Sequence, residues 1–324
     1  MDAPVRPDLA ADPVASVLEA HARGGLLALA TSGTTGDVGR RIVRSTGSWW
    51  LSFDAYGDLS GVGAGARLWV PGPMRATMNL FAAVHAAAVG ARLVADPALA
   101  THACLTPAQL AREGDRLLPG TRVVVAGDRL PAPLAAAASD KGLRVAHYYG
   151  AAELSFVAAG SSADDLRPFP GVEVEMRDGV IWVRSPYLCE GYADAVGGPL
   201  LRDGDWASVG DLGRFVGGAL VVLGRPGHVV TGGATVSLAE VEAALGAAAR
   251  APFAAVGVPH PTLGAVLAVV VTDPADEARL REHARALPAA QRPRLWYRRT
   301  HLPLTPAGKV DRIALTESLG EGRE

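Results

Sequence analysis

Apolar residues along the first half of this sequence follow two patterns that alternate with each other. Helical spacing recurs in segments at residues 14–23, 46–56, 77–89, 107 onward and 131–141. Short continuous apolar runs lie between these segments, at residues 26–30, 67–70, 91–95, 122–126 and 143–148. Alternation of buried-type strands with helices is typical of βαβ units. The pattern therefore predicts an α/β domain with a mostly parallel sheet up to about residue 155.

The pattern changes after Phe169 and again near Ser237. Short strand-like runs separated by Asp-Gly and Gly-Gly turns lie at residues 173–176, 180–184, 215–216 and 219–223. They predict a β-rich subdomain over about 170–223, antiparallel or barrel-like. After Ser237, a helix through Val241 and Leu245 is followed by predicted strands at 253–258, 266–271 and 294–298 and a charged helix at 276–286. We expect an N-terminal domain at 1–223 and a small α+β domain at 229–324.

Composition limits the possible functions. The 324 residues suffice for two or three domains, and 31 basic against 33 acidic side chains leave a net charge of −2, which gives no support to nucleic-acid binding. The two cysteines, Cys104 and Cys189, match neither a disulfide framework nor a zinc spacing. Residues 1–13 lack a signal-peptide core, and no apolar run reaches the length of a membrane helix. We therefore expect a cytoplasmic enzyme with no membrane partner.

Candidate chemistry first occurs in the segment T-S-G-T-T-G-D-V-G-R at residues 31–40. Its first six residues supply four hydroxyls and two glycines: Thr31, Ser32, Gly33, Thr34, Thr35 and Gly36. Glycines let backbone amides approach a ligand closely, and hydroxyls can donate to phosphate oxygens. The spacing is not that of a Walker loop. A phosphate-binding loop and a Ser/Thr/Gly surface turn fit this composition equally well.

Four later motifs change that balance. H-Y-Y-G-A-A-E ends a predicted strand at residues 147–153, and S-V-G-D-L-G places a carboxylate in a turn at 208–213. G-R-P-G-H-V-V at 224–230 leads into Gly232 and Gly233 and a helix with Glu240 and Glu242, and P-L-T-P-A-G-K-V-D-R follows at 303–312. With the loop at 31–40, these motifs in this order resemble the adenylate-forming superfamily of acyl-CoA synthetases, peptide-synthetase adenylation domains and luciferases. Residues 170–174, 178–182 and 204–206 are similar to short bacterial o-succinylbenzoate–CoA ligases.

The resemblance implies ATP-dependent activation of an aromatic or small acyl carboxylic acid, with formation of an acyl-adenylate. Charge accumulates on phosphate oxygens in such a reaction, so catalysis depends on positioning and neutralisation. The loop would hold the leaving phosphates, and Glu153 would bind Mg²⁺, which prefers carboxylate and phosphate oxygens. Lys309 would bridge the reacting carboxylate and phosphate. Without the other motifs, Glu153 would be an ordinary loop carboxylate and Lys309 a solvated side chain.

The resemblance also implies contacts with the nucleotide. Asp211 matches a ribose-binding carboxylate, and Arg225 would lie near the ribose and phosphate. By spacing alone, Asp211 equally fits an Asx-turn and Arg225 a salt bridge in a loop.

The adenine would meet two further segments by the same resemblance. The backbone of Gly127 and Asp128 would pack against the base and Tyr149 would stack on it, with Gly150 and Ala152 completing the second motif. A tyrosine at a strand end is also a common core residue.

In the superfamily the C-terminal domain is mobile, and a pantetheine thiol then takes the acyl group. The resemblance therefore implies a hinge at 224–228 with its pivot at Gly227, and a thiol channel lined by Gly232 and Gly233. CoA or an acyl carrier protein would be the acceptor. Two alternatives stay open: transfer to an amine, and a nucleotide-binding homologue without turnover.

Three departures from the superfamily pattern affect these expectations. Arg40 stands where lysine is usual, and Ala152 replaces a Thr or Ser whose hydroxyl would reach phosphate. About 30 residues precede the first motif, so we expect much of the usual N-terminal subdomain to be absent. That absence suggests an open site, a small substrate, or completion by a second protomer in a homodimer.

Overall fold

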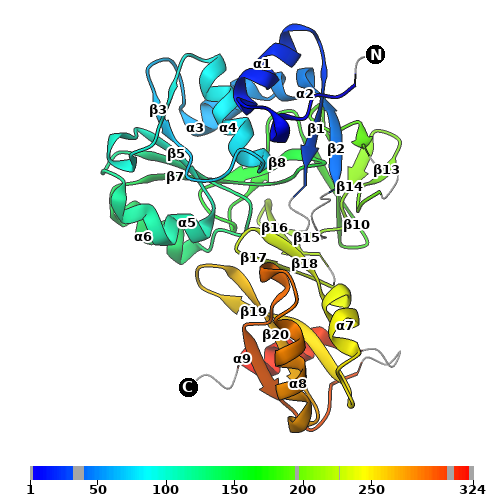
Figure 1. The fold of residues 1–324 in the computed structure, drawn as a ribbon. Helices are drawn as coiled ribbons and strands as arrows, with labels where there is room; N and C mark the ends of the chain where they lie inside the picture. Colours follow the sequence, from blue (N-terminus) through cyan, green and yellow to red (C-terminus); the bar gives the residue numbers. More distant parts are fainter. Residues whose placement is uncertain (1–2, 32–39, 194–196, 226, 305–309, 321–324) are drawn as a thin grey trace. The chain divides into compact units, whose positions relative to one another are not determined.

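The computed structural model describes residues 3–31, 40–193, 197–225, 227–304 and 310–320. The chain divides into two compact units, Met1–Leu223 (unit 1) and Gly224–Glu324 (unit 2). Figure 1 shows the elements of each unit, which are described in turn. Among the described residues, no helix has the length and apolar character needed to cross a bilayer.

A seven-stranded sheet in the order β4-β3-β5-β6-β7-β8-β9 forms the centre of unit 1. Its strands are β3 (Arg67–Trp69), β4 (Arg92–Val94), β5 (His102–Leu105), β6 (Arg122–Val125), β7 (Arg144–Ala151), β8 (Ser155–Gly160) and β9 (Arg167–Pro168). The pairs from β4 to β7 are parallel, as the alternating pattern predicts, and β8 and β9 add antiparallel pairs. Val123 and Val125 on β6 are fully buried. Burial of such apolar side chains on both faces stabilises a parallel sheet.

Six α-helices accompany this sheet in the described part of unit 1. They are α1 (Pro13–Ala22), α2 (Thr46–Trp50), α3 (Phe53–Ser60), α4 (Thr77–Ala88), α5 (Pro107–Glu113) and α6 (Ala132–Asp140). The single helix expected over residues 46–56 is wrong, because it forms as the two helices α2 and α3. Ser52, between them, donates its hydroxyl to the Trp49 carbonyl over 2.7 Å. A serine hydroxyl bonded to nearby backbone competes with helical hydrogen bonding.

Two antiparallel sheets complete unit 1. The smaller one joins β1 (Leu26–Ala30), β2 (Arg41–Ser45) and β12 (Gly191–Tyr192). The six-stranded one contains β10 (Glu173–Arg177), β11 (Val180–Arg184), β13 (Leu201–Asp203), β14 (Trp206–Ser208), β15 (Leu212–Val216) and β16 (Ala219–Gly224). Asp178 and Gly179, both at positive φ, turn the chain between β10 and β11. This matches the predicted Asp-Gly hairpin.

Unit 2 is a five-stranded sheet with helices on both faces. Its strands are β17 (His228–Thr231), β18 (Ala234–Ser237), β19 (Phe253–His260), β20 (Gly264–Val271) and β21 (Leu295–Arg298), and its helices are α7 (Leu238–Gly246), α8 (Pro274–Ala284) and α9 (Arg312–Gly320). Alternate residues of β20 belong to separate cores. Val269 packs with Leu245 and Leu280 from α7 and α8, whereas Val270 packs with Leu315 from α9.

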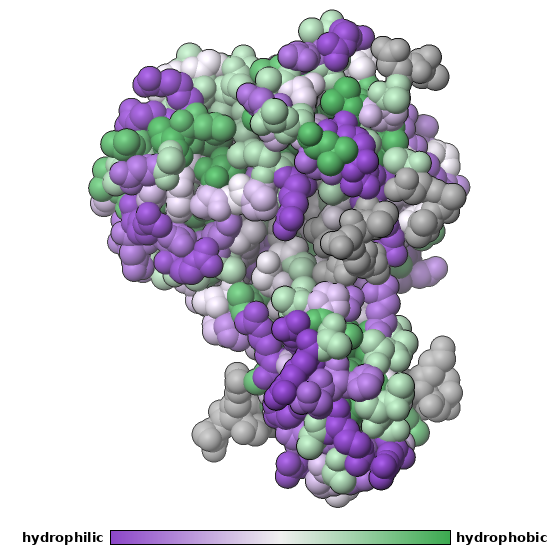
Figure 2. Space-filling view, in the orientation of Figure 1, coloured by the Kyte–Doolittle hydropathy of each residue, from purple (hydrophilic) through white to green (hydrophobic). Residues whose placement is uncertain are grey.

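Short 3₁₀ turns join several of these elements. They are η1 (Pro7–Leu9), η2 (Pro97–Leu99), η3 (Gly114–Arg116) and η4 (Ala289–Gln291). On the face drawn in Figure 2, hydrophilic and hydrophobic residues are interspersed over each unit. Such a mixture is ordinary for a folded protein, because there is not enough polar surface to cover the molecule.

Candidate active site

The ends of the Gly-rich loop are held by the first two strands. The Thr31 amide donates to the Arg40 carbonyl over 2.9 Å, which extends the β1–β2 pairing by one step. Thr77, the first residue of α4, donates its hydroxyl to the Ala30 carbonyl over 3.1 Å. The loop residues themselves lie outside the described part of the chain: Ser32, Gly33, Thr34, Thr35 and Gly36. The structure therefore places the base of the predicted phosphate loop and leaves its ligand contacts as a prediction.

Glu153 lies in the turn between β7 and β8 and is only 6% exposed. Its Oε1 accepts a hydrogen bond of 2.8 Å from the Tyr192 phenol. Its backbone carbonyl accepts from the Cys189 amide over 2.9 Å. Burial, together with the Glu153 carboxylate, raises the pKa of Tyr192 well above its usual value. Tyr192 therefore keeps its proton and remains a donor to Glu153.

Magnesium is the metal that the predicted chemistry requires. The described residues contain no group of three or more His, Cys, Asp or Glu side chains able to hold an ion. Mg²⁺ is commonly held by one or two carboxylates together with substrate phosphates and water. A single buried carboxylate such as Glu153 fits an ion of this kind, which arrives with a nucleotide.

Tyr149 and Asp211, predicted separately to contact adenosine, are brought together by the fold. The Tyr149 phenol donates to Asp211 Oδ2 over 2.8 Å. Tyr149 belongs to β7 of the large sheet, and Asp211 immediately precedes β15 of the six-stranded sheet. Both side chains are half-buried. A phenol ring beside a carboxylate offers an aromatic face and a hydroxyl acceptor at one place.

Glycine is favoured at the predicted positions of unit 1 for two different structural reasons. Gly127 follows β6 with φ of +82°, a conformation that favours glycine, and the Asp128 carboxylate accepts from the next amide over 2.7 Å. At Gly150, a Cβ would lie 2.1 Å from the Ser155 carbonyl oxygen, where the register of β7 and β8 shifts. Gly150 therefore allows a close backbone approach directly before Glu153.

Ala152 is also placed by this turn. Its carbonyl accepts a hydrogen bond of 2.8 Å from Arg44 Nη2. Arg44 is fully buried, and burial lowers its pKa to about 10, although nearby groups including Glu153 act in the opposite direction. At neutral pH the guanidinium is still charged, so a buried cation lies beside the Glu153 turn.

In unit 2, the predicted hinge and channel residues lie in and beside the first hairpin. Gly227 has φ of +69°, and its carbonyl accepts from the Leu238 amide over 2.8 Å. The Arg225 carbonyl accepts from the His228 amide over 3.0 Å. Gly232 and Gly233, at φ of +56° and +85°, form the turn between β17 and β18.

Lys309 lies outside the described residues, but its flanks are placed. Leu304 and Val310 form an antiparallel bridge, and the Asp311 amide donates to the Pro303 carbonyl over 2.8 Å. Arg312 donates to both Glu242 carboxylate oxygens, over 2.7 and 2.8 Å. A bidentate pair of this kind is geometrically specific. It attaches the start of α9, three residues after Lys309, to α7.

A depression of about 210 Å³ in unit 2 lies beside the predicted channel glycine. Its lining residues are Thr231, Gly232, Ala234, Leu267, Ala289, Ala290, Arg292 and Arg294. Sequence reasoning singled out Gly232 but missed the two arginines, which flank a proline in the sequence R-P-R at 292–294. Both are exposed. Two guanidinium groups at a depression can bind phosphate oxygens.

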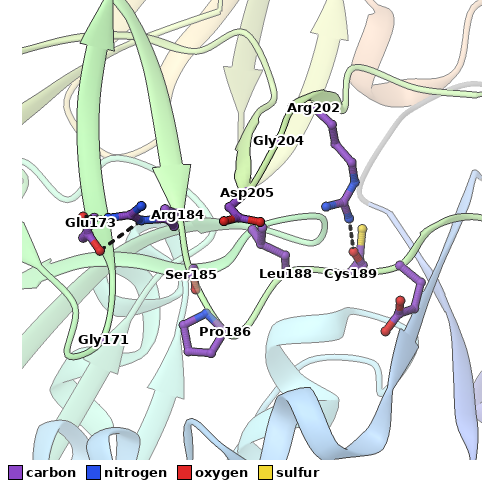
Figure 3. Close-up of a pocket in the computed structure, with 11 residues that line it drawn as sticks. Gly171, Glu173, Arg184, Ser185, Pro186, Leu188, Cys189, Arg202, Gly204 and Asp205 are labelled. Atoms are coloured by element: carbon purple, nitrogen blue, oxygen red, sulfur yellow. Dashed lines mark hydrogen bonds and ion pairs between the residues drawn. The ribbon is translucent and has the colours of Figure 1, made fainter.

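A larger depression, of about 540 Å³, lies in unit 1, and none of the predicted site residues is among those that line it. It is bounded by Gly171, Glu173, Arg184, Ser185, Pro186, Leu188, Cys189, Glu190, Arg202, Gly204 and Asp205. Figure 3 shows both of its arginines engaged with protein groups: Arg184 pairs with Glu173, and Arg202 donates to the Cys189 carbonyl. The size of this depression alone assigns it no chemistry.

Known proteins provide an independent comparison. No family model matches the chain. The uncharacterized acyl–CoA ligase YhfT of Bacillus subtilis is 27% identical over 332 residues, covering 90% of this chain and 68% of that protein. The 2-succinylbenzoate–CoA ligase of Salmonella typhimurium is 31% identical over 155 residues, covering 45% of this chain and 34% of that protein.

The solved structures include the amide bond synthetase McbA from Marinactinospora thermotolerans. It matches with a TM-score of 0.73 and 28% identity, covering 90% of this chain and 69% of that one. Similarity in sequence and in fold therefore extends over nine-tenths of this chain. The chain is similar to acyl–CoA ligases in sequence and to adenylate-forming enzymes in fold. The resemblance noted from the motifs is confirmed.

Two residues that the motifs did not reveal contact the turn that carries Glu153. Arg44 follows the phosphate-loop motif within a β-strand, and Tyr192 belongs to the two-residue strand β12. An arginine two residues after Ile42, on the same face of a short strand, was the available signal, because such a side chain needs a partner when that face is buried. Its partner could not be identified from the sequence, because Ala152 is 108 residues away along the chain.

Proposed function

We propose that this chain uses ATP to convert a carboxylic acid, aromatic or small acyl, into an acyl-adenylate, and then transfers the acyl group to the thiol of CoA. The observation that supports the first step most directly is the Tyr192–Glu153 hydrogen bond. Tyr192 pairs with Ile42 on β2, the strand that leaves the Gly-rich loop. The predicted phosphate loop and the predicted magnesium ligand are thus joined within unit 1.

In the first step, a carboxylate oxygen bonds to the α-phosphorus of ATP while the bond to pyrophosphate breaks. The loop residues would donate hydrogen bonds to the departing phosphates: Thr31, Ser32, Gly33, Thr34, Thr35 and Gly36. Glu153 would hold Mg²⁺, whose charge neutralises phosphate oxygens when it is bound. Lys309 would add a second positive charge to the reacting carboxylate and phosphate.

The nucleotide would be oriented by residues at the ends of three strands. Asp211 would accept hydrogen bonds from the ribose hydroxyls, and Arg225 would donate near the ribose and phosphate. Tyr149 would stack on the adenine, with the backbone of Gly127 and Asp128 against the other edge of the base. The Tyr149–Asp211 hydrogen bond supports this arrangement, because it fixes the ring beside the ribose acceptor.

In the second step, a thiolate sulfur bonds to the acyl carbon and AMP leaves with the electrons of the broken C–O bond. The depression beside Gly232 supports CoA as the thiol, because Arg292 and Arg294 suit the phosphates of a nucleotide-bearing acceptor. Gly232 and Gly233 would line the thiol channel, and residues 224–228 would be the hinge, with Gly227 absorbing the backbone change. An acyl carrier protein would present a single phosphodiester.

Transfer to an amine is the second candidate. Similarity to the amide bond synthetase McbA favours it, since that structure covers 90% of this chain, the same share as the acyl–CoA ligase YhfT. The adenylation chemistry is common to both candidates, so only the acceptor distinguishes them.

Pyrophosphate exchange over a panel of aromatic and aliphatic acids tests the first step. Acid-dependent exchange supports adenylation, and no exchange with any acid would leave a nucleotide-binding homologue without turnover. The active acid is then offered CoA, a holo-carrier protein or an amine. Thioester formation with CoA supports the proposal, amide formation supports the second candidate, and acylated carrier protein would correct the acceptor.

A further inference from the structure

Arg44 is a buried cation that the proposed chemistry does not yet use. Its side chain comes from β2, four residues after Arg40, and is fully buried. Taking a guanidinium out of water costs several kcal/mol unless hydrogen bonds and charges compensate it. A simple structural position on the buried face of this strand would be filled at a lower cost in free energy by an apolar side chain. The contacts of Arg44 therefore identify what its charge and geometry are used for.

Those contacts converge on the turn that carries Glu153. Arg44 Nη2 donates to the Ala152 carbonyl over 2.8 Å, and Nη1 donates to the Tyr187 carbonyl over 2.9 Å and to the Ser48 hydroxyl over 3.3 Å. Glu153 is among the charges that act on the guanidinium. One planar group thus joins the strand leaving the phosphate loop, the start of α2 and the residue before Glu153.

Tyr192 contacts the Glu153 carboxylate from strand β12, which pairs with β2 on the side opposite β1. Strand β12 pairs with β2 through Gly191 with Val43 and Tyr192 with Ile42. The Tyr192 oxygen accepts from the Leu200 amide over 3.1 Å and donates to Glu153 Oε1 over 2.8 Å. Because a phenol has a single proton, acceptance from Leu200 leaves that proton committed to Glu153.

We propose that Arg44 and Tyr192 are positioning residues that fix the Glu153 carboxylate relative to the phosphate loop, so that it binds the magnesium of MgATP. This inference rests on the proposed function. Arg44 fixes the backbone on one side of Glu153, and Tyr192 fixes one carboxylate oxygen. Ala152, which lacks the usual hydroxyl, contributes through its carbonyl. Residues that orient a metal ligand commonly change metal affinity about 10- to 100-fold when they are replaced.

Binding of ATP by calorimetry tests this without requiring turnover. Titrations with MgATP and with ATP in EDTA are compared for wild type, Arg44→Lys, Arg44→Met and Tyr192→Phe, with Glu153→Gln as the reference for loss of the ligand. We expect Arg44→Lys and Tyr192→Phe to weaken MgATP binding about 10-fold, and to leave ATP binding in EDTA within twofold of wild type. Arg44→Met should resemble Glu153→Gln, because it removes the charge as well.

Tyr187→Phe is the matched control, since the Tyr187 phenol also donates to a carbonyl, that of Pro170, over 2.8 Å. It should leave the magnesium dependence unchanged. If Arg44→Met does not fold, the comparison of MgATP binding with ATP binding in EDTA is made with Tyr192→Phe and Arg44→Lys. The inference would be overturned by variants that unfold at a lower temperature but keep the wild-type ratio of MgATP affinity to ATP affinity. Pyrophosphate exchange by the wild type would still support the proposed function in that case. A wild type without ATP binding in either buffer would overturn both.

Discussion

Two ionisable groups of unit 1 and two of unit 2 have different kinds of hydrogen-bond partner. In unit 1, Arg44 donates to two carbonyls and a hydroxyl, and His147 donates to the Val125 carbonyl over 2.8 Å. In unit 2, Arg312 meets the Glu242 carboxylate with two hydrogen bonds, and Glu277 pairs with Arg281 and Arg298.

This difference indicates separate uses of charge. A cation bonded to neutral groups keeps its field available to a neighbour such as Glu153, whereas a cation paired with a carboxylate is largely neutralised. We infer that the neutral partners of Arg44 leave its charge available near Glu153, and that the ion pairs of Arg312 and Glu277 contribute to the fold of unit 2. Lys309 is the predicted exception in unit 2.

Lys309→Ala tests that exception and has the largest expected effect. Removing one group that stabilises developing charge should lower pyrophosphate exchange by about 10²- to 10³-fold. Thermal unfolding should stay at the wild-type midpoint, because the ion pairs of unit 2 are intact. Glu153→Gln, in unit 1, should lower pyrophosphate exchange by a similar factor. Wild-type exchange in Lys309→Ala would show that this lysine has no catalytic role.

The pH dependence of folding stability should differ between the two units, and His147 is the group of unit 1 that tests this. Burial lowers the pKa of His147 from 6.5 to about 4, so the folded chain refuses a proton that the unfolded chain accepts. Stability from this group is complete above pH 6.5 and is lost as pH falls toward 4, by up to about 3 kcal/mol. Denaturant unfolding of wild type and His147→Gln at pH 7.5 and pH 5 measures it. The wild type should lose more stability than the variant; equal losses would contradict the assignment.

Unit 2 should respond to acid at lower pH. Hydrogen bonds from Arg298, opposed by burial and aided by Arg281, lower the pKa of Glu277 from its usual 4.5. A depressed carboxylate pKa gives stability that is present above the ordinary value and disappears as pH falls through the folded one. Amide exchange of peptides from α8, measured against a free-peptide reference between pH 5 and pH 3, should show protection falling below about pH 4.5. If the amides of α8 already lost their protection from exchange between pH 6.5 and 5, the two units would not differ in their response to acid.

Glu242→Gln tests the ion-pair reading of unit 2. The side chains of Arg312 and Glu242 are 34% and 25% exposed, so solvent screens them in part. The variant should lose about 1–2 kcal/mol of unfolding free energy, because Arg312 and the Ala255 amide lose a charged acceptor. Glu240→Gln, an exposed substitution on the same helix, is the control in urea titrations. Equal midpoints for the two variants would mean that the pair is dispensable.

Arg292→Ala and Arg294→Ala have the smallest expected effects. Each should raise KM for CoA about tenfold, since one charge-assisted phosphate contact is worth about 1.5 kcal/mol. KM for the acid and the rate of pyrophosphate exchange should not change. Arg285→Ala, at an exposed arginine that pairs with Glu282, is the control. An unchanged KM for CoA would remove the support that this depression gives to a nucleotide-bearing thiol.

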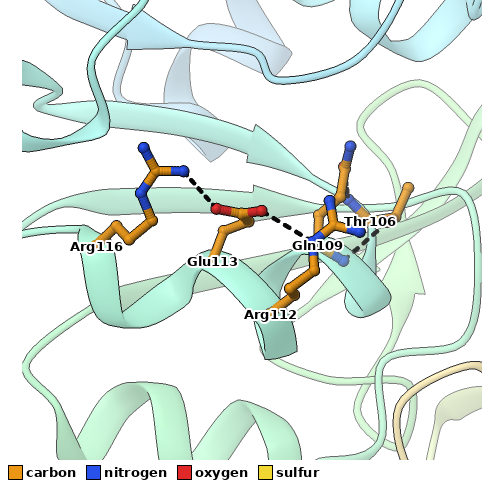
Figure 4. Close-up of polar contacts among 5 residues, drawn as sticks. All are labelled: Thr106, Gln109, Arg112, Glu113 and Arg116. Carbon is orange, nitrogen blue, oxygen red and sulfur yellow. Dashed lines mark hydrogen bonds and ion pairs between the residues drawn. The ribbon is translucent and has the colours of Figure 1, made fainter.

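The helices were predicted where the local sequence pattern is strong. The Ala-rich pattern at 77–89 became α4, and Thr106-Pro107 opens α5 with a full capping box in which Thr106 and Gln109 satisfy each other's amides. Figure 4 shows this box with the Arg112–Glu113–Arg116 group that follows it. Strands β5, β8, β9, β12, β13 and β14 were missed. All of them except β8, which has six residues, have four residues or fewer, which is too short for a period to be recognised.

The site was predictable only where a motif names the residue. Glu153, Asp211 and Tyr149 became candidates in this way, and the structure adds that Tyr149 contacts Asp211. Tyr192 was not identified, because it lies 39 residues from Glu153 and its meaning depends on the pairing of β12 with β2. Contacts between distant segments come from tertiary packing, which local patterns do not encode.

The close approach at Gly150 limits how this protein can be engineered. A designer who wished to randomise the end of β7 would have to hold residue 150 fixed. Any side chain there would push against the Ser155 carbonyl, since even a Cβ would come within 2.1 Å of its oxygen. The strain would be relieved by moving the intervening turn, and with it Glu153. A library that varies residue 150 would therefore also vary the position of the predicted magnesium ligand.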